Sequence, residues 1–223
     1  NTSKARYYWI PIDLLILSGD LADKFDVKVI DSIVENLSLN ETTEMIKDYH
    51  PDHIVILSSL LTHHEDRELV RSLRTFFSFK TTFIGDVFYF NPKMMIEFDE
   101  VDSIIYEYPC PQLASFIEEG SAKNNIIYKE VGEVIKTPIF TKVEIDYKTP
   151  RHDLFPIEKY TVPFMMSDIC TSILTNFGCK FTCNYCPASS VAYRERSLDD
   201  ILTEIKVLKD KGIDNYWIRD FTF

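Results

Sequence analysis

Segments typical of β-strands alternate with segments typical of α-helices between residues 26 and 119, and this order limits the possible folds more than any other feature. The run HIVILS at residues 53–58 is almost continuously apolar, as in strands that are buried on both faces of a parallel sheet. The predicted strands are Asp26–Asp31, His53–Ser58, Thr81–Gly85 and Val101–Tyr106, and the predicted helices are Glu41–Tyr49, Glu65–Phe77 and Gln112–Glu119. This alternation predicts an α/β fold with an open parallel sheet.

The pattern changes after residue 120. Strand-like pieces at Ile126–Val131 and Ile139–Ile145 predict a hairpin. Three prolines follow the hairpin: Pro150, Pro156 and Pro163. Because proline lacks a backbone N–H, this part is interpreted as a hairpin with a linker between two domains. The predicted organisation is a first domain at 1–120, a linking segment at 121–167 and a second domain from 168 to 223.

The second domain restarts the alternation with a strand at Cys170–Thr175 and ends with a strand at Tyr216–Phe221. Between them lies a helix with clear boundary signals, Ser197 as its N-cap and Gly212 after its last turn. Its apolar stripe consists of Leu198, Ile201, Leu202, Ile205 and Leu208. The segment is therefore predicted to form one strand–helix–strand unit with a long loop before its helix.

Three cysteines occupy eight positions of that loop, Cys179, Cys183 and Cys186, with the spacing C-x3-C-x2-C. Three thiolates in one compact loop can bind three irons of a [4Fe–4S] cluster and leave the fourth iron open for chemistry. A structural zinc site is the alternative, with Cys170 or a distant histidine as the fourth ligand. Cys110 and Cys170 stand alone and are interpreted as buried structural thiols. The clustering does not suit a secreted disulfide scaffold.

The net charge of −11 lies almost entirely in the front of the chain. Residues 1–150 hold 25 of the 35 acidic and 15 of the 24 basic side chains. A phosphate backbone would be repelled by this charge, which argues against a nucleic acid as partner. Neither a signal peptide nor a run of about 20 apolar residues is present, so we expect a cytoplasmic protein without a membrane span.

The run from Gly178 to Pro187 resembles the signature of the radical S-adenosylmethionine (SAM) enzymes, including Tyr185 before the third cysteine. The resemblance implies that Cys179, Cys183 and Cys186 hold a [4Fe–4S] cluster and that the open iron binds SAM. It further implies that SAM is cleaved to methionine and a 5′-deoxyadenosyl radical, and that Tyr185 lies against the adenine. The residues that follow would begin a TIM-type (βα) radical SAM barrel, of which this chain is expected to be an N-terminal fragment.

Residues 1–150 resemble the Rossmann-like cobalamin-binding domain that precedes the barrel in one subfamily of these enzymes. The residues at 58–62 (SSLLT) match its S-x-L-x-T element, which implies that Ser58 and Thr62 line the slot for the nucleotide tail of cobalamin. His63 and His64 are expected at a solvated helix start, so the cobalt would have no histidine ligand. Gly85-Asp86 stands where the subfamily has a Gly-Gly turn, which hinders close approach of the tail.

The resemblance implies an enzyme that uses cobalamin to transfer a methyl group to an unreactive carbon. Two alternatives remain: a cobalamin-independent radical SAM oxidoreductase or cyclase, and a non-catalytic cobalamin-like binding module with a structural or electron-transfer cluster. The expected partners are a small-molecule or peptide substrate and an electron donor such as flavodoxin or ferredoxin. No G-x-G-x-x-G run supports a nicotinamide cofactor.

Overall fold

The computed structural model describes residues 7–145, 147–162, 169–186, 188 and 191–222. The chain divides into two compact units, Leu37–Phe140 (the sheet unit) and Asn1–Asn36 with Thr141–Phe223 (the cysteine unit). The first 36 residues thus group with the C-terminal segment, whereas the sequence assigns them to the first domain. The predicted domain borders at residues 120 and 167 stay a prediction.

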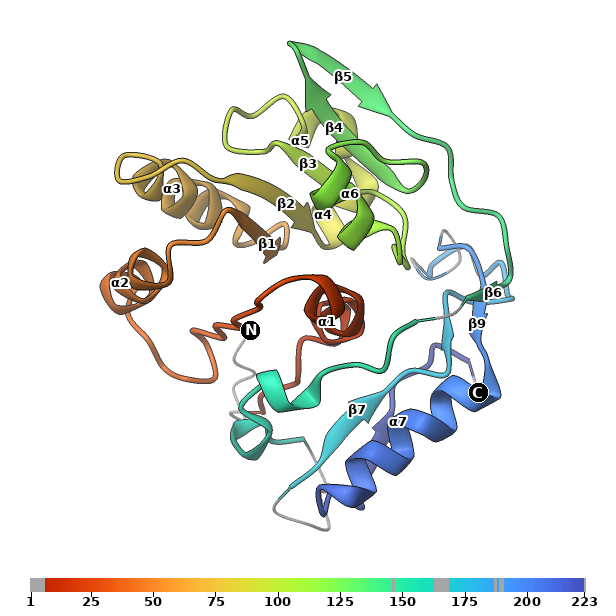
Figure 1. Ribbon diagram of the computed structural model, residues 1–223. Helices are drawn as coiled ribbons and strands as arrows, with labels where there is room; N and C mark the ends of the chain where they lie inside the picture. The colour runs from red at the N-terminus through yellow and green to blue at the C-terminus, as the bar shows by residue number, and fades with distance from the viewer. Residues whose placement is uncertain (1–6, 146, 163–168, 187, 189–190, 223) are drawn as a thin grey trace. The chain divides into compact units, whose positions relative to one another are not determined.

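The sheet unit is a mixed five-stranded sheet with its strands in the order β1-β2-β3-β4-β5 (Figure 1). Its elements in chain order are α2 (Leu39–Tyr49), β1 (His53–Leu57), α3 (His63–Leu73), β2 (Lys80–Ile84), α4 (Asp86–Phe90), α5 (Pro92–Met95), β3 (Ser103–Ile105), α6 (Leu113–Glu119), β4 (Ile126–Glu130) and β5 (Glu133–Lys136). The pairs β1–β2 and β2–β3 are parallel, and β3–β4 and β4–β5 are antiparallel. The predicted α/β sheet is confirmed in its parallel part, and an antiparallel hairpin forms its other edge.

The core of the sheet unit explains why the strands lie where the apolar runs are. Phe83 and Ile84 of β2 and Ile104 of β3 are fully buried. Phe88 of α4 stacks on Phe83 with 5.0 Å between the ring centroids. On this helix Phe88 is thus fully buried in the core, whereas Phe90 is 53 % exposed.

The cysteine unit begins with α1 (Ile12–Lys24) and continues after the sheet unit. Its later elements are β6 (Glu144–Ile145), the 3₁₀ turns η1 (His152–Leu154) and η2 (Ile157–Lys159), β7 (Thr171–Ile173), β8 (Asn176–Phe177), β9 (Arg194–Arg196), α7 (Leu198–Asp210) and β10 (Tyr216–Ile218). The strands β7 and β10 pair in parallel, with α7 between them in the chain. A second small sheet has the order β6-β9-β8. The predicted strand–helix–strand unit is present.

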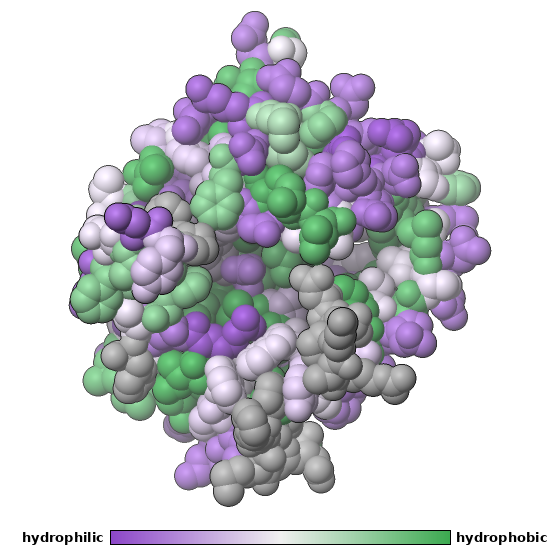
Figure 2. All heavy atoms as spheres, turned by 180° about the vertical axis from the view of Figure 1, so that it is seen from behind, coloured by the Kyte–Doolittle hydropathy of each residue, from purple (hydrophilic) through white to green (hydrophobic). Residues whose placement is uncertain are grey.

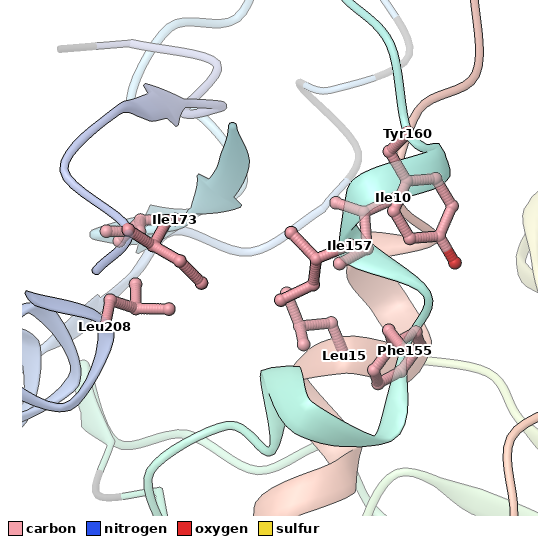
Figure 3. Packing of buried hydrophobic residues seen from close by; sticks show 8 residues of the cluster. Ile10, Leu15, Phe155, Ile157, Tyr160, Ile173 and Leu208 are labelled. Atoms are coloured by element: carbon pink, nitrogen blue, oxygen red, sulfur yellow. The ribbon is translucent and has the colours of Figure 1, made fainter. Parts of the chain in front are cut away.

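One hydrophobic cluster joins the distant segments of the cysteine unit. Its buried members are Ile10, Leu15, Phe155, Ile157, Tyr160, Ile173, Leu208 and Ile213. In Figure 3, Ile173 and Leu208 lie close to one another and face Ile157 and Leu15 across the cluster. Burial of these side chains stabilises β7, which precedes β8, and α7, which follows β9.

Two predictions about secondary structure are wrong, and a third element has other bounds than predicted. Residues 26–31 form no strand: the segment is irregular, and Val29 packs beside the cluster instead of pairing in a sheet. The second arm of the hairpin is Glu133–Lys136, and within Ile139–Ile145 the structure has only the short β6. The helix predicted at Glu65–Phe77 is present, but it runs from His63 to Leu73. Packing overrode β-propensity in the first case.

Apolar and polar side chains are mixed on the molecular surface, as Figure 2 shows for one face. On α7 the predicted apolar stripe divides, because Leu208 is buried whereas Leu198 and Leu202 are exposed. No helix in the described ranges is both long enough and apolar enough to cross a bilayer.

Candidate functional site

The cysteine loop, residues 178–186, leaves β8 and leads back to β9 and α7. Within it the N–H of Cys186 donates to the carbonyl oxygen of Cys183 at 3.1 Å, which closes a tight turn around Tyr185. The N–H of Phe181 points to the Cys179 sulfur at 3.4 Å. Local backbone bonding therefore keeps the three predicted ligands in one short stretch.

The side chains of this loop face solvent rather than the core. Cys183 is exposed, and Cys179 and Cys186 are half-buried. Tyr185 is 89 % exposed, so packing does not explain an aromatic residue at this position. Cys110, by contrast, is fully buried, as predicted for a structural thiol. The side chains of Cys183 and Tyr185 are therefore accessible to a ligand.

Cys170 lies outside the loop. The prediction of a buried thiol is only half right here, because this residue is half-buried and burial raises the pKa of its thiol. No disulfide joins any of the five cysteines, all of which the structure describes.

Two features fix the beginning of the cysteine loop. Gly178 has φ +66°, and a Cβ there would lie 2.5 Å from the carbonyl oxygen of Val191 and 2.6 Å from that of Ala192. Glycine is thus required for both its dihedral angle and the close approach of the two ends of the loop. Farther along, Lys180 forms a 3.1 Å ion pair with Glu195 of β9.

A buried polar network ties α7 to β7 and to the residues around it. Arg196 donates to the carbonyl oxygen of Leu174 at 2.8 Å and to Glu204 at 2.6 Å. His152 contacts the other Glu204 oxygen at 2.7 Å and Thr171 of β7 at 2.9 Å. Glu204 is fully buried within a stripe that the sequence presents as apolar, so its role could not be read from the helix pattern.

The donor chemistry of the cysteine loop suits a [4Fe–4S] cluster, since three thiols of one accessible loop can each become a thiolate ligand. Within the part of the chain that the structure describes, no three His, Cys, Asp or Glu side chains converge on one point. The fit therefore rests on the identity, spacing and exposure of the thiols.

The second predicted site, the hydroxyl loop (residues 58–62), follows β1 at the carboxyl edge of the parallel strands. Ser58 is 3 % exposed, and its hydroxyl donates to the Asp66 carboxylate in a short hydrogen bond. The Thr62 hydroxyl accepts the N–H of Ser59 at 3.1 Å. Burial raises the pKa of Asp66, and hydrogen bonds from Ser58 and Thr62 partly offset this effect. Both predicted hydroxyls are thus used within this part of the chain.

The two residues in place of the Gly-Gly turn hold the hydroxyl loop from the other side. Gly85 has φ +132°, and a Cβ there would overlap the carbonyl oxygen of Ser58. Asp86 accepts the N–H of Leu60 at 3.0 Å. The prediction of a solvated surface is wrong for His63, which is only 8 % exposed, whereas His64 is exposed.

The hydroxyl loop partly fits cobalamin. Exposed apolar side chains stand on the loop and on the two helices after β2: Leu60, Leu61, Phe90 and Met94. The carboxyl edge of parallel strands is where open α/β sheets bind ligands, and these side chains offer an apolar surface there. A nucleotide tail that bonds to Ser58, however, has to replace its hydrogen bond to Asp66.

No family model matches the chain. It is 25 % identical to the uncharacterised methyltransferase PH0819 of Pyrococcus horikoshii, over 96 % of this chain and 49 % of the relative. The chain thus spans about half the length of the curated relative that it matches.

Two solved enzymes share its fold. One is the cobalamin-dependent SAM radical enzyme OxsB with aqua-cobalamin and SAM bound, with a TM-score of 0.73, 18 % identity, and coverage of 96 % of this chain and 32 % of that chain. The other is the radical SAM methyltransferase TsrM of Kitasatospora setae with tryptophan and a SAM analogue bound, with a TM-score of 0.68, 17 % identity, and coverage of 99 % and 46 %. The chain therefore has a mixed α/β fold similar to that of cobalamin-dependent radical SAM enzymes.

Proposed function

We propose that the protein is a cobalamin-dependent radical SAM enzyme that transfers a methyl group to an unreactive carbon. The observation that carries the proposal is the cysteine loop, which presents three closely spaced thiols and an exposed tyrosine between β8 and α7. The shared fold with OxsB and TsrM and the sequence relation to PH0819 support it.

In this proposal Cys179, Cys183 and Cys186 hold the cluster, and Tyr185 stacks on the adenine of SAM. Ser58 and Thr62 contact the nucleotide tail of cobalamin. When bound, the cluster supplies the electron that cleaves SAM to methionine and a 5′-deoxyadenosyl radical, and cobalamin supplies the methyl group. The segment from β7 to β10 would begin the barrel, and its parallel pairing across α7 supports that assignment.

The proposal extends to partners and location. An electron donor such as flavodoxin or ferredoxin would reduce the cluster, and the substrate would be a small molecule or a peptide. We place the protein in the cytoplasm, where thiols stay reduced and available as ligands.

Anaerobic reconstitution of the intact protein tests the cluster. We expect about four irons and four sulfides per chain and an EPR signal on reduction. The change of all three loop cysteines to Ser should abolish both, whereas Cys170→Ser, a half-buried thiol of the same unit, should retain them. Tightly bound stoichiometric zinc, or a cluster that survives the triple change, would overturn the assignment.

Titration with hydroxocobalamin tests the second cofactor. We expect the absorbance of a base-off form, and weaker binding for Thr62→Leu than for the control Thr75→Leu on the exposed surface of the same unit. Because the hydroxyl loop satisfies its own hydrogen bonds, a cobalamin-independent radical SAM oxidoreductase or cyclase is the second candidate. A protein that cleaves SAM but binds no cobalamin would favour that candidate. A cobalamin-like module with a cluster and no SAM cleavage would contradict both.

A further inference from the structure

One carboxylate outside the cysteine loop accepts hydrogen bonds from the backbone just before the loop. Asp220 follows β10, and its Oδ1 accepts the backbone N–H groups of Thr175 at 2.8 Å and Asn176 at 3.3 Å. Its Oδ2 accepts the Asn176 side-chain amide at 2.9 Å and, in a short hydrogen bond, the Thr175 hydroxyl. Four donors from two adjacent residues thus converge on a single side chain.

These two residues occupy a branch point of the unit. Before them the chain pairs with β10 through β7, and from Asn176 onward it pairs with β9 through β8. The carbonyl oxygen of Thr175 also accepts the N–H of Arg196 at 3.0 Å. The direction in which the backbone changes sheets is therefore fixed by Asp220 on one side and by β9 on the other.

The branch point lies directly before the loop. Asn176 precedes Cys179 by three positions, and Gly178 between them has the positive φ that turns the chain. Asn176 is only 7 % exposed, and its Oδ1 has no hydrogen-bond partner among the described residues. Its amide nitrogen also donates to the carbonyl oxygen of Thr222 at 2.9 Å, so the Asn176 side chain is held at two points by the segment after β10.

We propose that Asp220 is a positioning residue for the cysteine loop. By holding Thr175 and Asn176, it sets the direction in which the chain enters Gly178 and hence the position of the Cys179 sulfur relative to the other two thiols. Charge-assisted hydrogen bonds to a carboxylate suit this task because they are shorter and stronger than neutral ones. The effect on a bound cluster rests on the proposed function, whereas the effect on the loop itself does not.

Asp220→Asn tests the proposal with little change in side-chain size, because an amide nitrogen cannot accept the hydrogen bonds that one carboxylate oxygen accepts. Asp214→Asn is the matched control, an exposed carboxylate two positions before β10. Thr175→Val removes one of the four donors, and Thr175→Ser restores it. If Asp220→Asn fails to fold, the Thr175 pair provides the test.

The first readouts use the protein without a cluster. We expect amide hydrogen exchange at Thr175 and Asn176 to rise about ten- to hundredfold in Asp220→Asn, the effect of losing charged hydrogen bonds. Alkylation of Cys179 should change at least about threefold relative to Cys170, with Asp214→Asn and Thr175→Ser at the wild-type rate. Equal exchange and alkylation in Asp220→Asn and Asp214→Asn would overturn the proposal.

The second readout separates positioning from simple stabilisation in the reconstituted protein. A positioning role predicts an altered EPR line shape and a shifted midpoint potential at unchanged iron content. A merely structural role predicts a lower unfolding midpoint with the wild-type spectrum in the folded fraction, and that result would overturn the proposal. If no cluster forms in the wild type while the thiol and exchange effects persist, the proposed function fails and the positioning role stands.

Discussion

The hydroxyl loop follows β1, which pairs in parallel with β2, whereas the cysteine loop follows β8, which pairs antiparallel with β9. The two loops differ in how far their side chains are buried and hydrogen-bonded. In the hydroxyl loop, Ser58 bonds to Asp66 and Leu60 bonds to Asp86. In the cysteine loop, the side chains of Cys183 and Tyr185 stand in solvent, and order is imposed at the root by Gly178 and Asp220. The hydroxyl loop is thus held by hydrogen bonds of buried and half-buried side chains, whereas the central side chains of the cysteine loop are exposed.

This difference predicts distinct responses to ligands. A ligand of the hydroxyl loop must exchange existing hydrogen bonds, which reduces the net gain on binding. A ligand of the cysteine loop binds thiols that are exposed or half-buried, so it displaces little packing and its binding adds to stability.

The largest effect is expected for Gly85→Ala, because its methyl group would overlap the Ser58 carbonyl and φ +132° disfavours any L side chain. We expect a loss of about 3–5 kcal/mol in the free energy of unfolding, measured by urea denaturation. Gly132→Ala is the control, with φ +84° and no atom within 4 Å of the added Cβ, and should cost only about 1–2 kcal/mol. Equal losses would show that the hydroxyl loop does not depend on this close approach.

Gly178→Ala tests the cysteine loop in the same way. The added Cβ would lie 2.5 Å from the Val191 carbonyl oxygen, so the two ends of the loop must separate. We expect a loss of about 2–3 kcal/mol and, in the reconstituted protein, iron content near background. Gly212→Ala, with φ +77° and open space around it, should keep its iron. A wild-type iron content in Gly178→Ala would mean that the backbone conformation at Gly178 does not control cluster binding by the three thiols.

The sequence predicted the parallel sheet and α7 because their signals are local. Apolar runs mark β1 and β2, and the Ser197 hydroxyl accepts the Asp200 N–H at 3.2 Å, as the capping pattern predicts. The helix α1 had no such signal, since Leu15, Ile16 and Leu17 are buried in succession and show no helical period.

The residues of the candidate sites likewise divide into those with a local sequence signal and those without one. The spacing of the three cysteines is a local pattern, and it placed them in one loop correctly. The Asp220 contacts join residues 44 and 45 positions apart, and a single aspartate after a strand does not reveal them. Likewise, nothing in the sequence shows that Ser58 bonds to Asp66 instead of facing an open slot. Hydrogen bonds between side chains that are distant in the sequence could not be predicted from it, because they depend on how the chain packs.

We expect His53, in the strand before the hydroxyl loop, to make the stability of the sheet unit sensitive to acid. Burial lowers the pKa of His53 to about 4, against the nearby Asp102 charge, which acts to raise it. The folded state therefore binds this proton less well than the unfolded state, so stability present above pH 6.5 is lost as pH falls towards 4. We expect His53 to contribute about 1–3 kcal/mol to that loss. His53→Gln should flatten the profile of unfolding free energy between pH 7 and 4, whereas the exposed His50→Asn should not.

The smallest effect concerns the bond that closes the hydroxyl loop. Asp86 accepts the Leu60 N–H at 3.0 Å in an exposed setting, where water can replace the carboxylate, so Asp86→Gly should cost under about 1 kcal/mol. Its effect on dynamics should be larger, with hydrogen exchange of the Leu60 amide rising severalfold, because the loop loses its tie to α4. Since a freed loop no longer has to give up this bond, Asp86→Gly should also bind hydroxocobalamin more tightly than wild type. Asp86→Asn, which keeps an acceptor oxygen for Leu60, should behave as wild type in both measurements. Unchanged Leu60 exchange in Asp86→Gly would show that the hydroxyl loop does not depend on Asp86, and the contrast with the cysteine loop would then rest on the hydrogen bonds of Ser58 and Thr62.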